Sequence, residues 1–553
     1  MAASESFDYV IVGAGTAGCV LAGRLGEDPA VRVCLIEAGG SDQHLLISTP
    51  AMVAAAIATK RLNWRFETVP QAHLKGRRIL QPRGKVIGGS GSINGMVYSR
   101  GHPRDYDDWA AAGAAGWDYA HVLPYFIRSE NNEDLPASFY HGRGGPVNVR
   151  RPPRPNRLNS DFIAATHSLG FPLASDFTGA DSEGVGLRQG TIRAGRRDST
   201  ARAFLRPAVR RGNVTVRTEA LALRVIVENG RAVGVAYEQG GGRHEVRAGR
   251  EVILSAGAVQ TPQLLLLSGI GPTAELKAQG IEPVHDLPGV GRNLHDHLAC
   301  PVLMHSADPT SYGISARALP RGIMNVFEYL LFRSGPLSSN VFESVAFLKT
   351  VPGLDRPDVQ FVFQPAARPK PTFPLPLGHG FAASPVCLYP KSRGRVTVSG
   401  PDPHAPPLID PALLSVATDI EPLVRAIKLA RRIFAAPHFS RYRATEVAPG
   451  PGVQTDADIA DFIRSTSYTV HHQVGTCRMG TGAGAVVDLQ LRLHGLQGLR
   501  IVDASIIPSI VGGNTNAIVV MIAEKAADLI RQRPLLAPAP MDQAPAQRAS
   551  AGN

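Results

Sequence analysis

A glycine-rich turn near the N-terminus limits the fold more than any other feature of this chain. The turn, residues 13–18, lies between an apolar stretch at 7–12 and a helix-like stretch at 16–25, and a second apolar stretch follows at 31–36. Strand, helix and strand within about 30 residues form the βαβ unit of a parallel sheet. The N-terminal part is therefore predicted to be an α/β, Rossmann-like domain.

The spacing of the turn, Gly13-x-Gly15-x-x-Gly18, is that of a dinucleotide-binding site. The first glycine permits the tight turn, the second lets the backbone approach a pyrophosphate, and the third allows close packing of helix on strand. The helix N-terminus offers free N–H groups to the phosphates. Glu37 ends the second strand, where it can accept hydrogen bonds from ribose hydroxyls and disfavours the 2′-phosphate of NADP. The turn alone leaves FAD and NAD open, and a tight turn without a ligand is the alternative.

Chain length and composition indicate more than one domain. At 553 residues the chain is too long for a single hydrophobic core. Proline becomes more frequent between about 300 and 467, where strand-like stretches such as 359–363 and 395–398 occur. Elsewhere we expect strands at 214–217, 223–227, 234–237, 251–255 and 499–502, a hairpin turn at Asn229-Gly230, and helices at 261–267 and 517–530. The Pro- and Ala-rich residues 534–553 are predicted to be disordered.

The net charge of +12 raises the question of an anionic partner. Arginines are scattered rather than clustered, so no nucleic-acid partner is predicted, while an anionic substrate or anionic lipid stays open. The five cysteines lack a CxxC pair and do not form a disulfide pattern, which favours a reducing compartment. The N-terminus lacks a signal-peptide pattern, and no apolar stretch reaches about 20 residues. We therefore expect a cytoplasmic protein, with peripheral contact at the inner face of the membrane left open.

Three later motifs carry a resemblance to a known family. They are GKVIGGSGSING at 84–95, GAVQTPQLLLLSGIG at 257–271, and the C-terminal pair of YTVHHQVGTCRMG at 468–480 with a second segment inside 502–517. With these motifs the chain resembles the glucose–methanol–choline (GMC) oxidoreductases from residue 7 to about 530, and most closely the bacterial alcohol and choline dehydrogenase-like members. The resemblance implies a discontinuous FAD-binding domain at 1–150, 190–300 and 468–533, and a substrate domain at 151–189 and 301–467 built on an antiparallel sheet with helices.

The resemblance also implies the cofactor and the residues around it. Non-covalent FAD is expected, because Ile93 stands where some relatives attach the flavin through a histidine. The small side chains of the 84–95 stretch let a flat ring lie against backbone N–H groups. The residues expected to contact FAD are Gly13, Gly15, Thr16, Ala17, Gly18, Glu37, Ala38, Trp64, Gly88, Gly89, Ser90, Asn94, Gly95, Met96, Val97, Asp503, Ala504, Asn516 and Ala517.

Two side chains are expected to perform the chemistry. Accepting a hydroxyl proton suits an imidazole, whose ordinary pKa lies near neutrality. By the resemblance, His472 is the proton acceptor and Asn516, an amide that does not titrate, is the second catalytic residue. His471 is the competitor, although neighbouring side chains on an extended segment point opposite ways. Gln473 departs from the proline that often follows the family's histidine.

The expected reaction is hydride transfer from a primary alcohol to flavin N5, which yields the aldehyde. The alcohol, the electron acceptor (oxygen, or a quinone or dye) and the oligomeric state stay open. Alternatives are a lyase of the hydroxynitrile type with structural FAD, an NAD-linked dehydrogenase, and a flavin-free binding protein. No metal is predicted, because His295, Asp296 and His297 lie in a loop without further ligands nearby in the sequence. Cys477 is expected to be a buried, inert thiol.

Overall fold

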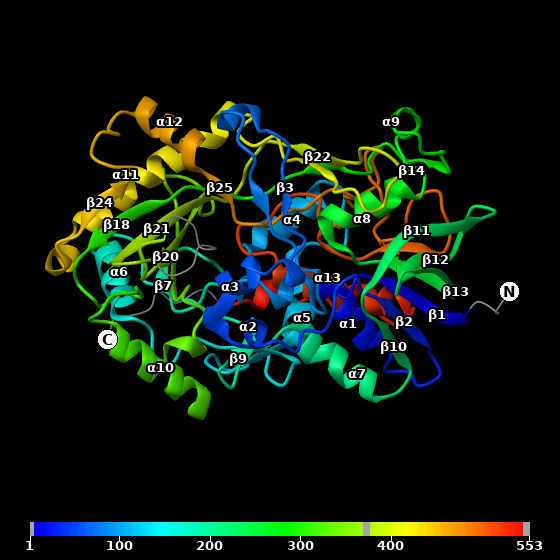
Figure 1. Ribbon diagram of the computed structural model, residues 1–553, viewed down its shortest axis with the longest axis horizontal. Helices are drawn as coiled ribbons and strands as arrows, with labels where there is room; N and C mark the ends of the chain where they lie inside the picture. The colour runs from blue at the N-terminus through cyan, green and yellow to red at the C-terminus, as the bar shows by residue number, and fades with distance from the viewer. Residues whose placement is uncertain (1–4, 369–375, 546–553) are drawn as a thin grey trace.

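A mixed seven-stranded sheet carries the N-terminal turn (Figure 1). The computed structural model of the protein describes residues 5–368 and 376–545. The sheet order is β10, β2, β1, β13, β12, β11, with β26 also paired to β13. The bounds are β1 Glu5–Val12, β2 Val33–Ile36, β10 Val214–Arg217, β11 Ala220–Glu228, β12 Arg231–Gln239, β13 Gly242–Leu254 and β26 Leu499–Ile501. Strands β10, β2, β1, β13 and β26 are mutually parallel, and β11 and β12 extend the sheet in antiparallel pairs. The predicted βαβ unit is confirmed.

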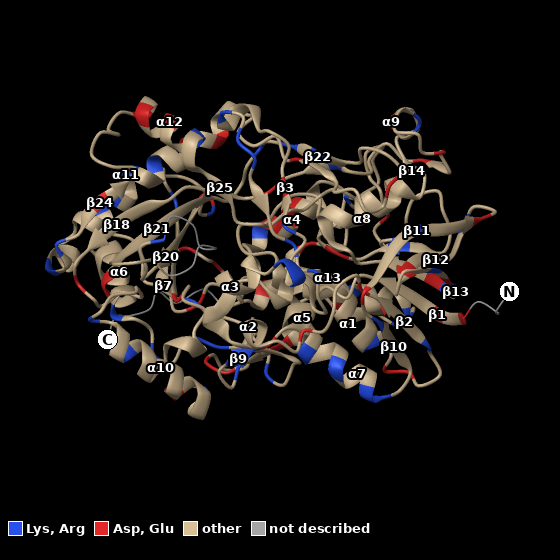
Figure 2. Cartoon of the chain, in the orientation of Figure 1, with Lys and Arg blue, Asp and Glu red and all other residues tan. Residues whose placement is uncertain are grey.

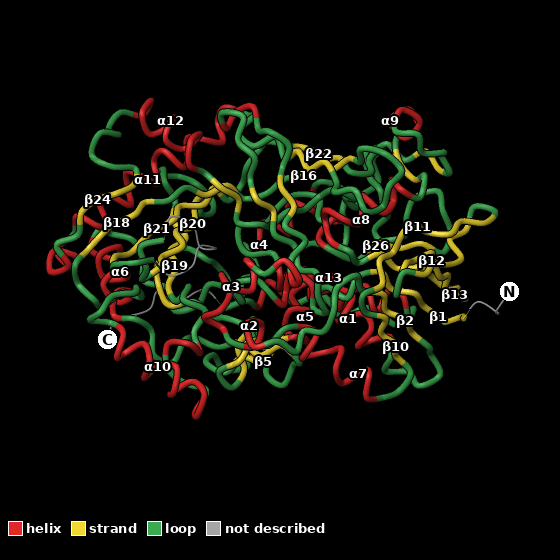
Figure 3. Tube along the Cα trace, viewed as in Figure 1, coloured by secondary structure: helices red, strands yellow, loops and turns green. Residues whose placement is uncertain are grey.

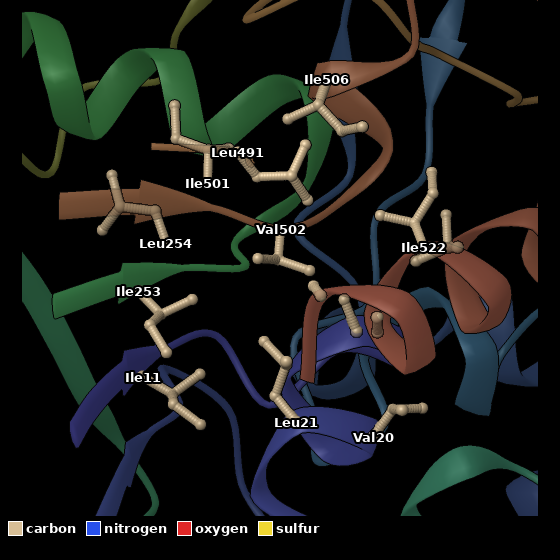
Figure 4. Packing of buried hydrophobic residues seen from close by; sticks show 14 of the residues in the cluster. Ile11, Val20, Leu21, Ile253, Leu254, Leu491, Ile501, Val502, Ile506 and Ile522 are labelled. Carbon is tan, nitrogen blue, oxygen red and sulfur yellow. The ribbon is translucent and has the colours of Figure 1, made fainter. Parts of the chain in front are cut away.

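Three helices of this half pack on one another. Helix α1 (Thr16–Leu25) contacts α13 (Asn516–Ile530), and α13 contacts α5 (Tyr119–Ser129). Thirteen of the fifteen residues of α13 are buried, because the helix is apolar on nearly every side and runs through the interior. Figure 4 shows this packing, with Leu21 of α1 and Ile522 of α13 near Val502, which follows β26.

A second, antiparallel sheet lies at the other end of the molecule (Figure 1). Its order is β24, β18, β21, β20, β19, β7, with β17 paired to both β21 and β25. The bounds are β7 Gly184–Leu187, β17 Leu298–Ala299, β18 Val302–Ser306, β19 Ser344–Leu348, β20 Val359–Gln364, β21 His379–Cys387, β24 Thr445–Ala448 and β25 Tyr468–Thr469. Helices α6 (Arg157–Ser168) and α11 (Glu421–Ala435) contact the sheet, and α12 (Asp456–Thr466) packs on α11. An antiparallel sheet with helices was expected for the second domain, and this expectation is confirmed.

Each sheet has its own hydrophobic core. The larger core joins the first sheet to α1, α5 and α13, and the second joins β18–β21 to α6, α11 and α12. The domain boundaries predicted above remain a prediction, which two separate cores support. Figure 3 shows loop segments concentrated in the central region between the two sheets.

The remaining elements are short connections around these two sheets. Their bounds are α2 Leu45–Ser48, α3 Val53–Ala58, α4 Pro103–Ala111, α7 Arg206–Arg210, α8 Gly257–Leu267, α9 Thr273–Ala278, α10 Leu319–Phe332, β3 Phe66–Glu67, β4 Leu80–Gln81, β5 Glu130–Asn132, β6 Val147–Val149, β8 Ile192–Arg193, β9 Arg196–Arg197, β14 Ile270–Gly271, β15 His285–Asp286, β16 Arg292–Leu294, β22 Gly394–Thr397 and β23 Leu408–Asp410. Strands β11 to β13 are longer than the sequence predicted, because they form a continuous meander with alternating exposure.

Helix α8 begins four residues earlier than predicted. We expected a helix at 261–267, but it starts at Gly257 and includes Pro262 in its interior. Proline lacks an N–H, so the carbonyl four residues before it, at Ala258, needs another donor. The Thr476 hydroxyl supplies it by donating to Ala258 O at 2.7 Å. The contact with Thr476 therefore offsets the cost of placing Pro262 inside the helix.

Helix α10 is exposed on the surface at the edge of the molecule (Figure 1). Met324, Leu331 and Phe332 are each at least 70% exposed, and Phe327 is 60% exposed. Figure 2 shows little charge along this helix. Scattered apolar residues are normal on a surface, but a helix with a contiguous apolar face is typical of an interaction surface.

The ends of the chain add two findings. Residues 534–545, in the tail predicted to be disordered, have defined contacts: Ala539 N donates to Ala120 O and Leu536 N to the Tyr125 hydroxyl. The rest of that predicted tail, 546–553, lies outside the described residues. Among the residues described, no helix combines the length and apolarity needed to cross a membrane.

Candidate active site

A cavity of about 840 Å³ lies where the glycine turn, the 82–97 segment and the C-terminal segments meet. Its walls come from five parts of the chain that are far apart in the sequence. They are 12–17, 82–97, 255–264, 468–473 and 503–519, with further residues from 36–38, 64–69, 220–222 and 403–408. A cavity of this size and mixed lining has the volume of a cofactor and small-substrate site.

One end of the cavity is built from backbone that leaves no room for side chains. A Cβ added to Gly13 would lie 2.6 Å from Ser255 O, and one added to Gly89 would lie 2.7 Å from the Gly15 Cα. Gly13 also has φ +97°, which favours glycine. Helix α1 starts beside this backbone, and no side chain caps its N-terminus, so its first N–H groups remain available to phosphate oxygens. The arrangement fits a dinucleotide pyrophosphate.

Glu37 closes the same end as an acceptor. It is buried, lines the cavity, and accepts hydrogen bonds from Ala14 N at 2.9 Å and Gly39 N at 2.8 Å. Burial raises the pKa of its carboxyl to about 7, against two backbone donors that act in the opposite direction. Hydroxyl donors from a ribose would further favour the ionised form, so this position fits a ribose that keeps its 2′-hydroxyl.

Most residues that the sequence assigned to the cofactor do line the cavity. They are Gly13, Gly15, Thr16, Ala17, Glu37, Ala38, Trp64, Gly89, Ser90, Asn94, Gly95, Met96, Val97, Asp503, Ala504 and Asn516. Gly18, Gly88 and Ala517 do not. Gly18 lies behind the turn, where an added Cβ would be 1.9 Å from Gly13 O; Gly88 donates its N–H to Ala14 O at 2.7 Å; and Ala517 is buried within α13. These three shape the walls from behind.

Sequence analysis missed one wall of the cofactor end, the segment 255–258 at the end of β13. No residue of the 257–271 motif was among the expected FAD contacts, yet Gly257 and Ala258 line the cavity directly. Asp503 ties this wall to the C-terminal segment by accepting from Gly257 N at 2.8 Å and from the Thr261 hydroxyl at 2.6 Å. A signal for this wall was present in the sequence. The motif directly follows the strand β13, which is parallel to β1, so it lies at the same edge of the sheet as the glycine turn.

His472 stands at the other end of the cavity, half-buried and held on three sides. Its backbone N–H donates to Asp296 Oδ1 at 2.7 Å. Its Nδ1 lies 3.0 Å from His297 Nδ1, and its Nε2 lies 3.0 Å from Asn514 Nδ2. Burial, followed by the nearby histidines, holds the pKa of His472 well below its ordinary value, so the ring is neutral at pH 7.

The chain of contacts fixes which ring nitrogen carries the proton. His297 Nε2 lies 3.0 Å from Leu388 O, and a carbonyl accepts only, so His297 Nε2 is the protonated atom. Burial lowers the pKa of His297 to about 4, so its Nδ1 carries a lone pair. His472 must then donate from Nδ1, and its Nε2 is left with a lone pair facing the Asn514 amide. The geometry therefore prepares His472 Nε2 to accept a proton.

Asn514, and not Asn516, is the amide beside His472. The sequence assigned this place to Asn516, which instead accepts a hydrogen bond from the Thr16 hydroxyl at 2.8 Å. Asn516 begins α13, so its side chain is directed by the helix start toward α1, whereas Asn514 lies in the preceding loop. The sequence offers two asparagines two residues apart, and no spacing rule separates them.

His471 lines the same cavity, but the reason given for setting it aside was incomplete. We treated the segment as extended, yet His471 has φ +66°, in the left-handed region. Its carbonyl accepts from Arg83 Nη2 at 2.6 Å, and its Nδ1 lies 3.3 Å from the Thr469 hydroxyl. The kink, rather than strand alternation, separates its side chain from that of His472.

The neighbouring loop histidines serve the same network. No group of three or more potential metal ligands occurs within the described ranges. Asp296 binds the His472 backbone, His297 binds its ring, and His295 Nε2 accepts from Ile510 N at 2.8 Å. All five cysteines, at positions that the structure describes, are buried and free, and burial raises the pKa of Cys477 well above the ordinary thiol value.

Comparisons with known proteins agree over nearly the whole chain. A family model described as GMC oxidoreductase matches in two parts, at residues 7–299 and 390–523. The chain is 45% identical over 526 residues to an alcohol dehydrogenase [acceptor] of Pseudomonas putida, covering 95% of each chain. It is 44% identical to an oxygen-dependent choline dehydrogenase of Rhizobium etli, covering 96% of each. Among solved structures, pyridoxine 4-oxidase from Mesorbium loti has a TM-score of 0.86 at 33% identity, covering 96% of this chain and all of the other.

Proposed function

This chain belongs to the GMC oxidoreductases, FAD-dependent enzymes that act on CH–OH donors, and we propose that it oxidises a primary alcohol to the aldehyde with His472 as proton acceptor. The observation that carries the proposal is the chain of contacts from Leu388 O through His297 to His472 Nδ1, which leaves His472 Nε2 facing the Asn514 amide. A neutral imidazole with its lone pair at Nε2, beside an amide donor, is what removal of a hydroxyl proton requires.

The residues divide the reaction between them. FAD held by the cavity residues given above would supply the acceptor for the carbon-bound hydrogen. His472 Nε2 takes the hydroxyl proton, and the Asn514 Nδ2–H group can donate to the substrate oxygen as negative charge develops there. Asp296 and His297 hold the backbone and ring of His472, so the base does not need to reorient before the proton moves.

Non-covalent binding of FAD is part of the proposal. Ile93, at the position where some relatives attach the flavin, is an apolar side chain that offers no nucleophile. The sixteen cavity-lining residues given above would hold the cofactor through backbone N–H groups, the α1 N-terminus and Glu37. Acid precipitation of the holoenzyme should therefore release all of the flavin into the supernatant.

The test measures flavin reduction under anaerobic conditions. The reduction is monitored as the loss of flavin absorbance near 450 nm. His472→Ala should keep FAD but slow reduction by an alcohol about 10²-fold or more, the range for loss of a general base. His305→Ala, an exposed histidine of β18, is the matched control and should reduce at the wild-type rate. Near-normal reduction by His472→Ala would move the role to another residue. A flavin that no alcohol bleaches would favour the lyase alternative.

A cytoplasmic location with peripheral contact to a membrane also remains our proposal. The exposed apolar face of α10 supports it, as does the net charge of +12, which favours anionic lipid. Membrane contact would suit a quinone as electron acceptor. Flotation with vesicles containing anionic lipid should retain the wild-type enzyme and release a Phe327→Asp, Leu331→Asp variant; equal behaviour of the two would contradict the role of α10.

A further inference from the structure

Arg188 is a buried cation in the wall of the cavity. It follows β7, lines the cavity and is only 5% exposed. Its Nε donates to Phe342 O at 2.6 Å, which fixes the direction of the guanidinium group. Its central carbon lies 5.6 Å from the centre of the Phe342 ring, and that of Arg368 lies 6.0 Å from the same centre. Two positive groups therefore flank one aromatic wall residue.

No carboxylate neutralises Arg188 in the described part of the chain. Burial alone, without a charged partner among the described residues, lowers its pKa to about 9. At that value it is still protonated at pH 7. The parts of the sequence outside the described ranges, 1–4, 369–375 and 546–553, contain no Asp or Glu. An unpaired buried charge is costly, so such a group is expected to have a partner in the working state.

The acidic residues of the cavity wall are occupied elsewhere. They are Glu37, Glu67 and Asp503. Glu37 and Asp503 accept from backbone and hydroxyl donors at the cofactor end, and Glu67 is exposed at the end of β3. Glu343, whose backbone carbonyl accepts the Arg188 N–H, directs its carboxylate to neutral donors on Asn156, Asn159 and Ser339.

Arg188 lies close in sequence to residues that contact the 82–97 segment of the cavity wall. Gly190 forms a bridge with Val97, and Tyr98 N donates to Gln189 O. Phe342 packs against Gly95, where an added Cβ would be 3.0 Å from the ring. His472 lines the same cavity from a different segment, and the wall residues Val97, Phe342, Val362, Tyr468 and Val470 are largely apolar.

We infer that Arg188 binds an anionic group on the substrate, so that the preferred class is a primary alcohol that also carries a carboxylate, separated from the hydroxyl by a short apolar spacer. With Nε engaged by Phe342 O, the two Nη atoms remain as a fork that can hold both oxygens of a carboxylate. A cationic alcohol such as choline would meet a like charge. The inference rests on the proposed function, because it names the substrate of the same site.

The experiment compares three alcohols by anaerobic flavin reduction: an n-alkanol, the ω-hydroxycarboxylate of equal chain length, and choline. For the wild-type enzyme, kcat/KM should be at least about 10-fold higher for the hydroxycarboxylate than for the alkanol, and lowest for choline. Arg188→Met should lower kcat/KM for the hydroxycarboxylate about 10²-fold, mostly through KM, and lower that for the alkanol much less. Arg188→Lys should restore part of the difference, because it keeps the charge without the fork.

Each outcome separates the inference from the proposed function. FAD content and melting temperature are measured for every variant, with the exposed Arg395→Met as the matched control. Equal loss for alkanol and hydroxycarboxylate in Arg188→Met would show a structural role or a contact with the flavin, and would overturn the inference. So would a wild-type enzyme without preference for the anion. Failure of all three alcohols, and of a wider set, to reduce the flavin would instead overturn the proposed function.

Discussion

The two ends of the cavity are built in different ways. At the cofactor end the walls are backbone: Gly13 approaches Ser255, and Gly89 approaches Gly15, so closely that no side chain fits between them. At the substrate end the walls are side chains on strands and loops of the second sheet, among them Arg188, Phe342 and Val362. The first end recognises a shape shared by a family, and the second recognises whatever alcohol this member uses. The glycine spacing thus shapes the cofactor end, whereas substrate specificity depends on side chains that belong to no sequence motif.

The largest effect is expected from Gly18→Ala, which tests whether the backbone packing is required. The added Cβ would lie 1.9 Å from Gly13 O, and a backbone atom cannot move aside cheaply. We expect loss of most bound FAD and a loss of stability of about 3 kcal/mol or more. Flavin absorbance per polypeptide and thermal unfolding measure both. The control is Gly322→Ala in α10, where nothing lies within 4 Å. Full FAD content in Gly18→Ala would show that close backbone packing is not required at the cofactor end.

A smaller effect is expected at Asn514, which lies beside His472. Asn514→Ala removes the donor beside His472 Nε2 and should slow flavin reduction about 10- to 100-fold with FAD retained. Asn516→Ala removes the acceptor for the Thr16 hydroxyl and should instead weaken FAD binding with less effect on the reduction rate. Stopped-flow reduction and FAD dissociation constants distinguish the two. The reverse pattern would restore Asn516 as the second catalytic residue.

His297 is expected to act only through His472. His297→Phe removes the acceptor that fixes the His472 tautomer, so reduction should slow about 10-fold. The acid limb of its pH profile should also move upward, because the contribution of His297 to the depressed pKa of His472 is lost while burial remains. His297→Asn, which keeps an acceptor, should recover part of the rate. A uniform rate loss in both variants without any change in pH profile would indicate a packing role alone.

The smallest effect is the pH dependence of the wild-type enzyme. Because burial depresses the pKa of His472, the neutral base is present above that depressed value and is lost only as pH falls through it. Flavin reduction with an uncharged alcohol should therefore change less than about 2-fold between pH 6 and pH 8. A decline centred near pH 6.5 would show that the histidine titrates normally in the holoenzyme.

The cofactor end could be predicted from the sequence because each requirement is local. The tight turn, the close approach and the acidic strand end follow one another within about 25 residues, and each has a spacing rule. The same is true of the first sheet, where β1, α1 and β2 occur nearly where the apolar pattern placed them. Three cofactor residues, Gly18, Gly88 and Ala517, proved to support the wall from behind rather than line it.

The substrate end could not be predicted because its contacts are set by tertiary structure. Arg188 meets Phe342 only because β7 pairs with β19, which is about 150 residues further along the chain. Asn514 and Asn516 differ only in whether the helix has begun. The start of α8 depended on Thr476, more than 200 residues away, which replaces the missing donor of Pro262. Sequence periodicity contains no information on such partners.

The bond between Thr16 and Asn516 joins the starts of two helices that are 500 residues apart in the chain. Synthesis proceeds from the N-terminus, so the glycine turn leaves the ribosome long before the segment that completes its cavity. A nascent chain therefore has an incomplete cavity wall until α13 has emerged. We expect a chain that ends before α13 to retain FAD poorly, because the lining residues at 503–519 would be missing.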